Sequence, residues 1–281
     1  MLIKTKSEIK KINEGGKILG KILEKLARAC KPGVSTWQID REAERMIKEA
    51  GGRPAFKEYK SCPTDSPFPC TICASLNSEL VHGIAKKEII LKDGDIFTID
   101  IGMEWPHKKA GFFSSSESKS RKKGFFTDTA LTLAIGNIPE ETKKLMRVTK
   151  NALEIGIKAA RPGNSVADIG RAIEDYVAAQ GKYGIVRDLV GHGVGYAVHE
   201  EPRIPNYYDK KLERFILKPG MVLAIEPMIS IGSHKVKNAK DGWTIVMEDE
   251  SLCAHFEHTV VITEQGCDIS TRRPNEKKEK I

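Results

Sequence analysis

The sequence contains no long hydrophobic run, neither at its start nor elsewhere in its 281 residues. Residues 1–14 scatter lysines among single apolar residues, which excludes the continuous apolar stretch of a signal peptide. No other segment reaches the length needed to cross a lipid bilayer. We therefore expect no membrane association.

The chain also lacks the cysteine pattern of a small disulfide scaffold, and a chain of this length buries a core without such cross-links. Its six cysteines are Cys30, Cys62, Cys70, Cys73, Cys253 and Cys267. Cys70 and Cys73 form a CxxC pair, but the second Cys/His pair that a structural zinc site requires is missing. We expect reduced thiols that line a pocket or pack in the core, and a cytoplasmic location.

Aromatic residues are missing from the most basic segments, residues 119–123 and 272–280. The formal net charge of +8 could indicate a polyanionic partner such as nucleic acid. Without aromatic side chains for base stacking, these segments are better interpreted as solvated parts of an enzyme. A transient contact with the ribosome stays open as a hypothesis.

What the sequence does contain is regular helical patterning. Residues 7–30 carry apolar side chains at helical spacing, which predicts a first helix. A second helix is predicted after Ser35, which forms a capping box with Gln38, and Gly51-Gly52 ends it.

The chain then repeats itself. Residues 31–35 (Lys-Pro-Gly-Val-Ser) are echoed by residues 161–165 (Arg-Pro-Gly-Asn-Ser), and a long amphipathic segment, residues 140–160, precedes the second copy. Residues 92–100 align with residues 218–226 in the same way. An internal repeat of this kind predicts two structurally similar halves.

We place these halves at about residues 1–136 and 137–270, within a single catalytic domain of residues 1–270 that a flexible basic tail, residues 271–281, follows. Long helices followed by short strands indicate an α+β fold with an antiparallel sheet covered by helices. An approximate twofold axis between the halves would bring equivalent strand positions to one central place.

Carboxylates occupy those equivalent positions. Asp100 and Glu226 end the repeated strand segments, while Asp128 and Glu257 each precede a short segment rich in threonine and valine or leucine. A carboxylate in such apolar segments is costly unless it is paired, protonated or bound to a cation, and residues 96–101 and 221–228 contain no lysine or arginine. A single strand carboxylate is more often structural, but its repetition favours a pair of divalent metal ions.

A glycine-rich segment, residues 191–202, adds two histidines. Its exposed backbone could let His192 and His199 point into a cavity, although the spacing alone does not exclude a glycine-rich turn with two surface histidines. Carboxylates with at least one imidazole suit Zn, Mn, Fe or Co.

Four motifs, taken with these residues, resemble the type I, bacterial-type methionine aminopeptidases over nearly the whole chain. They are NSELVHGI at 77–84, IDIG at 99–102, GHGVG with HEEP at 191–202, and LAIEPMI at 223–229. The resemblance implies the pita-bread, or creatinase/aminopeptidase-like, fold: a pseudo-twofold antiparallel sheet flanked by helices. It also implies removal of the N-terminal methionine of nascent polypeptides that have a small second residue.

The resemblance further implies a metal site that holds two divalent ions, Co, Mn, Fe or Zn. Its ligands would be Asp100, Asp128, His192, Glu226 and Glu257. A water activated by both ions would attack the first carbonyl, Glu226 would accept its proton, His199 would hydrogen-bond the carbonyl oxygen, and His82 would contact the scissile amide nitrogen.

The methionine pocket of the family falls on four residues, each of which could equally belong to the core. They are Tyr59, Phe68, Cys73 and Trp243. Two insertions depart from the family pattern, at residues 105–123 and 60–66, and the second makes the position of Tyr59 less secure than that of Trp243.

The protein is expected to be a monomer, and two other functions stay open. One is an Xaa-Pro peptidase of the same fold, although such relatives usually carry a large additional N-terminal domain. The other is a non-enzymatic pita-bread protein that binds RNA or the ribosome, which would be expected to have lost metal ligands.

Overall fold

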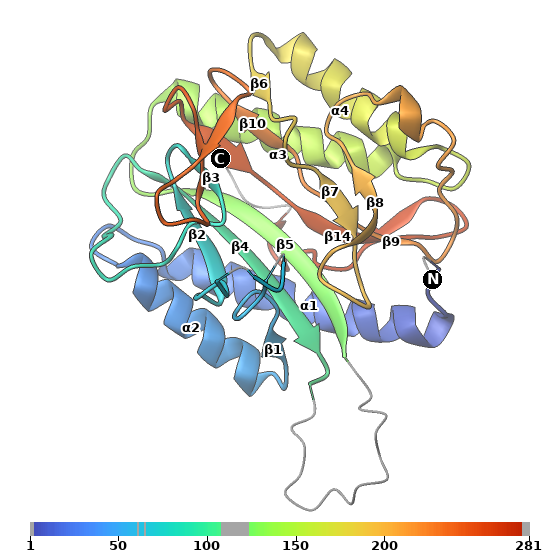
Figure 1. The fold of residues 1–281 in the computed structure, drawn as a ribbon, viewed down its shortest axis with the longest axis horizontal. Helices are drawn as coiled ribbons and strands as arrows, with labels where there is room; N and C mark the ends of the chain where they lie inside the picture. The colour runs from blue at the N-terminus through green and yellow to red at the C-terminus, as the bar shows by residue number, and fades with distance from the viewer. Residues whose placement is uncertain (1–2, 61, 65, 108–123, 277–281) are drawn as a thin grey trace, which may run out of the picture.

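The computed structural model describes residues 3–60, 62–64, 66–107 and 124–276, and Figure 1 shows their arrangement. Both predicted insertions and the predicted tail therefore lie partly outside the described residues, at 61 and 65, at 108–123, and at 277–281. Within the described ranges, no helix combines the length and apolar character that a membrane crossing requires.

Within the described residues, four α-helices form two pairs, one pair for each copy of the sequence repeat. They are α1 (Lys6–Ala29), α2 (Thr36–Glu49), α3 (Glu140–Ala159) and α4 (Val166–Gln180). Ser35 caps α2 and Ser165 caps α4, each in a capping box. Between the helices of each pair, Gly33 and Gly163 adopt φ values of 93° and 88°, a left-handed conformation that favours glycine and explains why the Pro-Gly step recurs.

The first half supplies a group of strands, all but the third of which belong to one sheet. They are β1 (Arg53–Pro54), β2 (Ile72–Leu76), β3 (Glu79–Val81), β4 (Ile96–Trp105) and β5 (Phe125–Ala134). β4 pairs with β1, β2 and β5, always antiparallel. Helix α1 packs on β4 and β5, the two long strands that cross the middle of Figure 1.

The second half supplies the remaining elements. They are β6 (Gly184–Ile185), β7 (Gly191–Gly193), β8 (Glu200–Ile204), the 3-10 helix η1 (Lys210–Leu212), β9 (Val222–Ile225), β10 (Met228–Ser230), β11 (Val236–Asn238), β12 (Ile245–Met247), β13 (Cys253–His255), β14 (His258–Ile262) and β15 (Cys267–Ile269). A central sheet runs in the order β15-β14-β9-β7-β8, β10 pairs with β6 and β13, and β12 pairs with β11 and with β3 of the first half. These pairings are antiparallel, so the predicted α+β class is confirmed.

The two halves meet where β5 passes the start of β14. Thr259 Oγ1 accepts a hydrogen bond from the Asp128 amide at 2.9 Å and donates one to the Asp128 carbonyl at 2.8 Å. The Thr129 hydroxyl donates to the Glu257 carbonyl at 2.8 Å, and the Glu257 amide donates to the Ala130 carbonyl at 3.1 Å. These bonds hold the backbones of Asp128 and Glu257 side by side.

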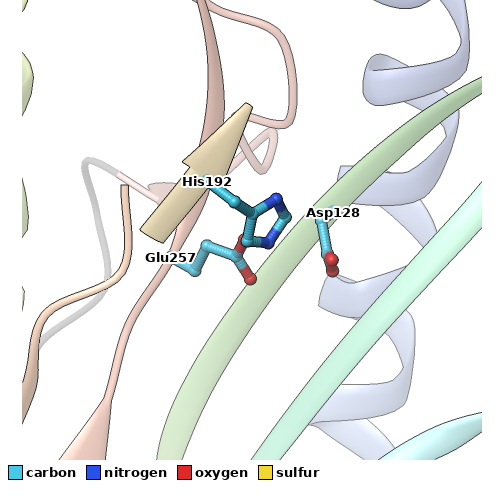
Figure 2. A group of neighbouring side chains, drawn as sticks. All are labelled: Asp128, His192 and Glu257. Atoms are coloured by element: carbon cyan, nitrogen blue, oxygen red, sulfur yellow. The ribbon is translucent and has the colours of Figure 1, made fainter. Parts of the chain in front are cut away.

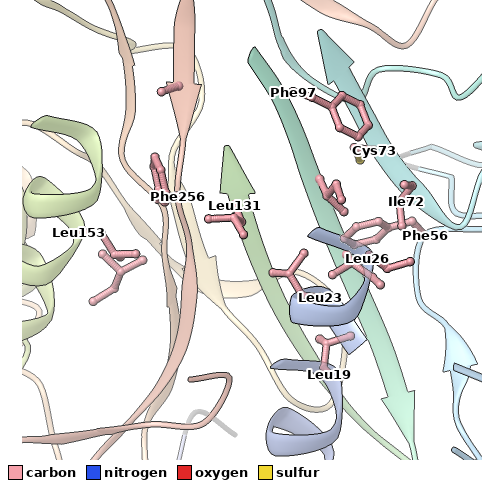
Figure 3. Close-up of a cluster of buried hydrophobic side chains, with 14 of the residues drawn as sticks. Leu19, Leu23, Leu26, Phe56, Ile72, Cys73, Phe97, Leu131, Leu153 and Phe256 are labelled. Atoms are coloured by element: carbon pink, nitrogen blue, oxygen red, sulfur yellow. The ribbon is translucent and has the colours of Figure 1, made fainter. Parts of the chain in front are cut away.

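The core joins both halves as well. Leu19, Leu23 and Leu26 of α1 point toward the sheet, and Figure 3 shows them near Leu131 of β5. Leu153 of α3 belongs to the same cluster of buried side chains. Apolar burial of this kind, worth about 25 cal/mol per Å², makes a rigid frame on which polar strand residues can be positioned.

The segment 271–276 differs from the predicted tail. Thr271, Arg273 and Glu276 are buried, and Glu276 Oε1 lies 2.8 Å from Nε2 of His258 in β14. Arg273 contacts the same carboxylate oxygen at 2.8 Å. Sequence reasoning reads this segment as polar and exposed, but Arg273 and Glu276 compensate each other's charge in the interior, beside His258.

Candidate metal centre

The five predicted metal ligands come from five different elements that converge on the middle of the molecule. Asp100 lies on β4, Asp128 on β5 and His192 on β7, while Glu226 directly follows β9 and Glu257 directly precedes β14. Alternation along strands directs these side chains to one face, because residues two apart share a face. The strand pairing therefore gathers residues that are far apart in sequence.

Three of these side chains form a compact group. Asp128, His192 and Glu257 each offer one potential ligand atom, and these atoms all lie within 4.8 Å of one another. Figure 2 shows the two carboxylates and the imidazole turned toward one another across the meeting point of the strands. All three residues are buried.

Glu226 and Asp100 border this group. Glu226 Oε1 lies 3.6 Å from Nε2 of His192, which places this carboxylate beside the group. Asp100 is 8% exposed and stands opposite Cys73 in the β2–β4 register. The structure thus places all five predicted ligands around one locus.

The hydrogen bond of His192 fixes its chemical form. Its Nδ1 lies 2.9 Å from the carbonyl oxygen of Gly193, and a carbonyl can only accept. Nδ1 therefore carries the proton, and Nε2 presents a lone pair toward Glu226 and the other carboxylates. Metal-binding histidines are held in this way by a partner at the second ring nitrogen.

The carboxylates destabilise one another when no cation is present. Burial, followed by the charge of Glu226, raises the pKa of Asp100 to about 7, and burial raises the pKa of Glu226 to about 8. Burial and the neighbouring carboxylates also raise the pKa values of Asp128 and Glu257. A divalent cation would reverse this effect, because it favours the ionised forms.

Two buried oxygens of the cluster lack partners within the described part of the chain. Asp100 Oδ1 and Glu257 Oε1 accept no hydrogen bond. A buried polar atom without a partner is costly, and an ion supplies the missing interaction. Together with the free lone pair of His192, these oxygens form a mixed oxygen and nitrogen donor set that fits divalent transition metals.

The two other predicted histidines lie at the edge of the cluster. The His199 ring is 4.5 Å from the His192 ring and is exposed at the cavity mouth. His82 has a φ of 58°, and its ring packs edge-on at 6.3 Å from Trp243. Burial, and then the charge of His199, lowers the pKa of His82 to about 4, so its ring is neutral near pH 7.

A cavity of about 540 Å³ opens onto the cluster, and every predicted site residue lines it. Phe68 and Trp243 form one wall, with ring centroids 5.3 Å apart in an edge-on arrangement. Tyr59 and Cys73 also line this cavity. The cavity is thus largely apolar beside a carboxylate cluster, which suits a ligand with an apolar side chain and a polar reacting group.

Sequence reasoning missed several lining residues. They are Phe56, Val81, Leu189, Val190, Gly191, Glu200, Glu201, Arg203 and Met228. It also missed His255, whose Nε2 lies 3.3 Å from Glu226 Oε2. The one available signal was the position of His255 two residues before Glu257, a spacing that is too common to single out.

Comparisons with known proteins agree over most of the chain. The model of metallopeptidase family M24 matches residues 10–114 and 115–264. Methionine aminopeptidase 1 of Bacillus subtilis strain 168 is 44% identical over 273 residues, which is 97% of this chain and 99% of that protein. Methionine aminopeptidase of Clostridium acetobutylicum is 41% identical over 271 residues, or 96% and 98% of the two chains.

Solved structures show the same fold. Methionine aminopeptidase from Rickettsia prowazekii superposes with a TM-score of 0.84 at 34% identity, over 96% of this chain and 100% of that one. The prolidase from Pyrococcus horikoshii has a TM-score of 0.71 at 22% identity, over 98% of this chain but 65% of that one, and therefore supports the fold alone. The predicted pita-bread fold is confirmed.

Proposed function

This chain belongs to metallopeptidase family M24, and on that premise we propose that it removes the N-terminal methionine of nascent polypeptides at the centre formed by Asp128, His192 and Glu257. The resemblance inferred from the sequence motifs is confirmed, because near full-length relatives of 41–44% identity are methionine aminopeptidases. The protein is thus a metal-dependent aminopeptidase. The observation that carries the assignment of the site is the convergence of these ligands at the floor of a largely apolar cavity.

We assign the five ligands to two divalent ions. Asp128 and Glu257, which hydrogen bonds between the two halves hold side by side, would help to hold both ions. Asp100 would complete one site, and His192 with Glu226 the other. When bound, such ions polarise the first carbonyl of the substrate and make water acidic enough to react near neutral pH.

The side chains around the centre have separate tasks in this proposal. Glu226 accepts the proton of the attacking water, for which a carboxylate near the reacting atoms is suited. His199, exposed at the cavity mouth, donates a hydrogen bond to the carbonyl oxygen as negative charge develops there. His82, neutral and half-buried beside Trp243, contacts the scissile amide nitrogen.

The apolar wall would hold the methionine side chain. Phe68 and Trp243 offer aromatic edges, and Cys73 offers a thiol, all of which pack well against a thioether. We propose that the preferred substrates have a small second residue. We further propose that the protein acts in the cytoplasm as a monomer and contacts the ribosome transiently. Light scattering and co-sedimentation with ribosomes test the last two points.

The two alternative functions have less support. The prolidase likeness is restricted to the fold, and this chain covers only about two thirds of that protein. A non-enzymatic RNA-binding role would leave the intact ligand set without a purpose. Neither alternative explains why an apolar cavity ends on four carboxylates.

Hydrolysis of Met-Ala-Ser by metal-stripped protein, with and without added Mn, Fe, Co or Zn, tests the proposal. We expect release of methionine only with metal, and a loss of about a thousandfold or more in Asp128→Asn and Glu226→Ala, because each removes a ligand of ions that contribute several kcal/mol. An Ala-Pro peptide is the substrate control. Cleavage of the Ala-Pro peptide alone would favour the prolidase function. If neither peptide is cleaved with any of the metals, the proposed peptidase activity is contradicted.

A further inference from the structure

Tyr59 makes a contact that a pocket-lining role does not require. Its hydroxyl oxygen lies 2.8 Å from Nδ1 of His199, and the two rings meet edge-on with centroids 5.3 Å apart. Among the described residues, the hydroxyl has no other recorded hydrogen-bond partner. The phenol and the imidazole are thus a specific pair at the mouth of the cavity.

The backbone holds Tyr59 at this place despite the adjacent insertion. Its amide donates to the Phe56 carbonyl at 2.8 Å, and its carbonyl accepts from the Phe68 amide at 2.9 Å. The neighbouring Glu58 amide donates to the Phe68 carbonyl at 2.8 Å. These bonds tie residues 58 and 59 to Phe68 and so fix the backbone that carries the phenol.

The contact with the hydroxyl bears on which nitrogen of His199 carries the proton. A neutral imidazole has one N–H and one lone pair, and the tautomer follows from the bond made by the other nitrogen. Burial raises the pKa of Tyr59, so the phenol keeps its proton and needs an acceptor. Nδ1 of His199 lies within reach of this proton at 2.8 Å, and a bond in this direction requires that the proton of His199 be on Nε2.

We propose that Tyr59 is a positioning residue that holds His199 as the Nε2–H tautomer, with its N–H available to the substrate carbonyl oxygen. Without this bond, the exposed His199 ring would be free to rotate or to place its lone pair toward the substrate. This inference rests on the proposed role of His199. It adds a second task to Tyr59, because the ring also lines both this cavity and a neighbouring one of about 730 Å³.

The test uses Tyr59→Phe in the full chain, because phenylalanine keeps the ring and its wall while it removes only the hydroxyl. We expect kcat on Met-Ala-Ser to fall about tenfold, with KM changed less than about twofold, since one hydrogen bond is lost and the apolar contacts remain. Tyr183→Phe, at a partly buried tyrosine in a different cavity, is the matched control and should leave both constants unchanged.

A double-mutant cycle shows whether Tyr59 acts through His199. In a His199→Ala background, adding Tyr59→Phe should cause no further loss of kcat. An equal loss in both backgrounds would overturn the proposal, as would an unchanged kcat in Tyr59→Phe itself.

A spectroscopic measurement separates this inference from the proposed function. The ¹⁵N shifts of the imidazole rings at pH 8 report the tautomer of each of the seven histidines, and loss of a signal in His199→Ala assigns the relevant one. We expect the Nε2–H form in the metal-free wild type and a mixture in Tyr59→Phe. If His199 of the wild type has the Nδ1–H form, the inference is overturned, even if the protein releases methionine. If the expected shifts are observed, the inference on the tautomer is supported, even if the protein does not release methionine.

Discussion

The carboxylate of Glu226 lies between two histidines, one at each oxygen: His192 Nε2 is 3.6 Å from Oε1, and His255 Nε2 is 3.3 Å from Oε2. His255 is 1% exposed, and burial lowers its pKa to about 3, so it stands beside Glu226 as a neutral ring. Neither of its ring nitrogens has a hydrogen-bond partner of good geometry among the described residues. His255 is therefore placed to orient Glu226 without adding charge.

Replacement of His255 tests this relationship. We expect His255→Leu to lower kcat about 10- to 100-fold, the usual effect of removing a group that orients a metal ligand, while His255→Gln, which retains an N–H, recovers part of the loss. Steady-state kinetics and metal titration provide the measurement. His234→Leu, at an exposed histidine, is the control. Equal activities of the Leu and Gln variants would mean that His255 only fills space.

Trp243 should affect substrate affinity more than turnover. Its ring packs against Phe68 and His82 at the cavity wall, so Trp243→Ala removes apolar contact with the methionine side chain. We expect KM for Met-Ala-Ser to rise about tenfold, with a smaller change in kcat. Trp37→Ala, at a tryptophan of α2 that is 38% exposed, serves as the control. A fall in kcat at constant KM would place Trp243 in the chemistry instead.

The metal-free protein should lose stability as pH rises. The folded-state pKa values of Asp100 and Glu226, about 7 and 8, lie above their ordinary values, so the folded state binds more protons than the unfolded state. The contribution of these two groups to stability is therefore fully present below about pH 4 and is lost as pH increases through 7–8.

Asp128→Asn isolates this effect, because the variant removes one of the repelling charges. Without metal, we expect its melting temperature to exceed that of the wild type at pH 8, by a margin that shrinks toward pH 5. Thermal unfolding followed by circular dichroism measures the difference, and added Mn should stabilise only the wild type. A difference that does not vary with pH would contradict the repulsion among the carboxylates.

Glu276 should stabilise the protein with the opposite pH dependence. Burial alone would raise its pKa, but the hydrogen bond with His258 and the charges of His258 and Arg273 bring it down to about 2. The contribution is thus present above the unfolded pKa of about 4.5 and disappears as pH falls through about 2.

Glu276→Gln should therefore lower the free energy of unfolding by about 3 kcal/mol at pH 7, and by progressively less below pH 4.5. Urea unfolding at several pH values gives the measurement, with the exposed Glu264→Gln as control. A variant as stable as the wild type at pH 7 would mean that residues 271–276 contribute little to the fold.

The local features of this protein could be read from its sequence because they depend on neighbouring residues. Ser35 with Gln38, and Ser165 with Asp168, cap their helices through contacts three residues apart. The ligand set could be read for a different reason: buried strand segments with carboxylates but without lysine or arginine leave a cation as the natural compensator.

Only the tertiary structure decided the contacts that join distant residues. Tyr59 and His199 are 140 positions apart, and no local pattern predicts that their side chains meet. The same holds for His255 beside Glu226, and for Glu276, whose charged segment looks like a solvated tail until His258 and Arg273 are seen beside it in the interior. Local propensity is set by residues a few positions away, whereas the cost of a buried charge depends on whichever groups the fold places around it.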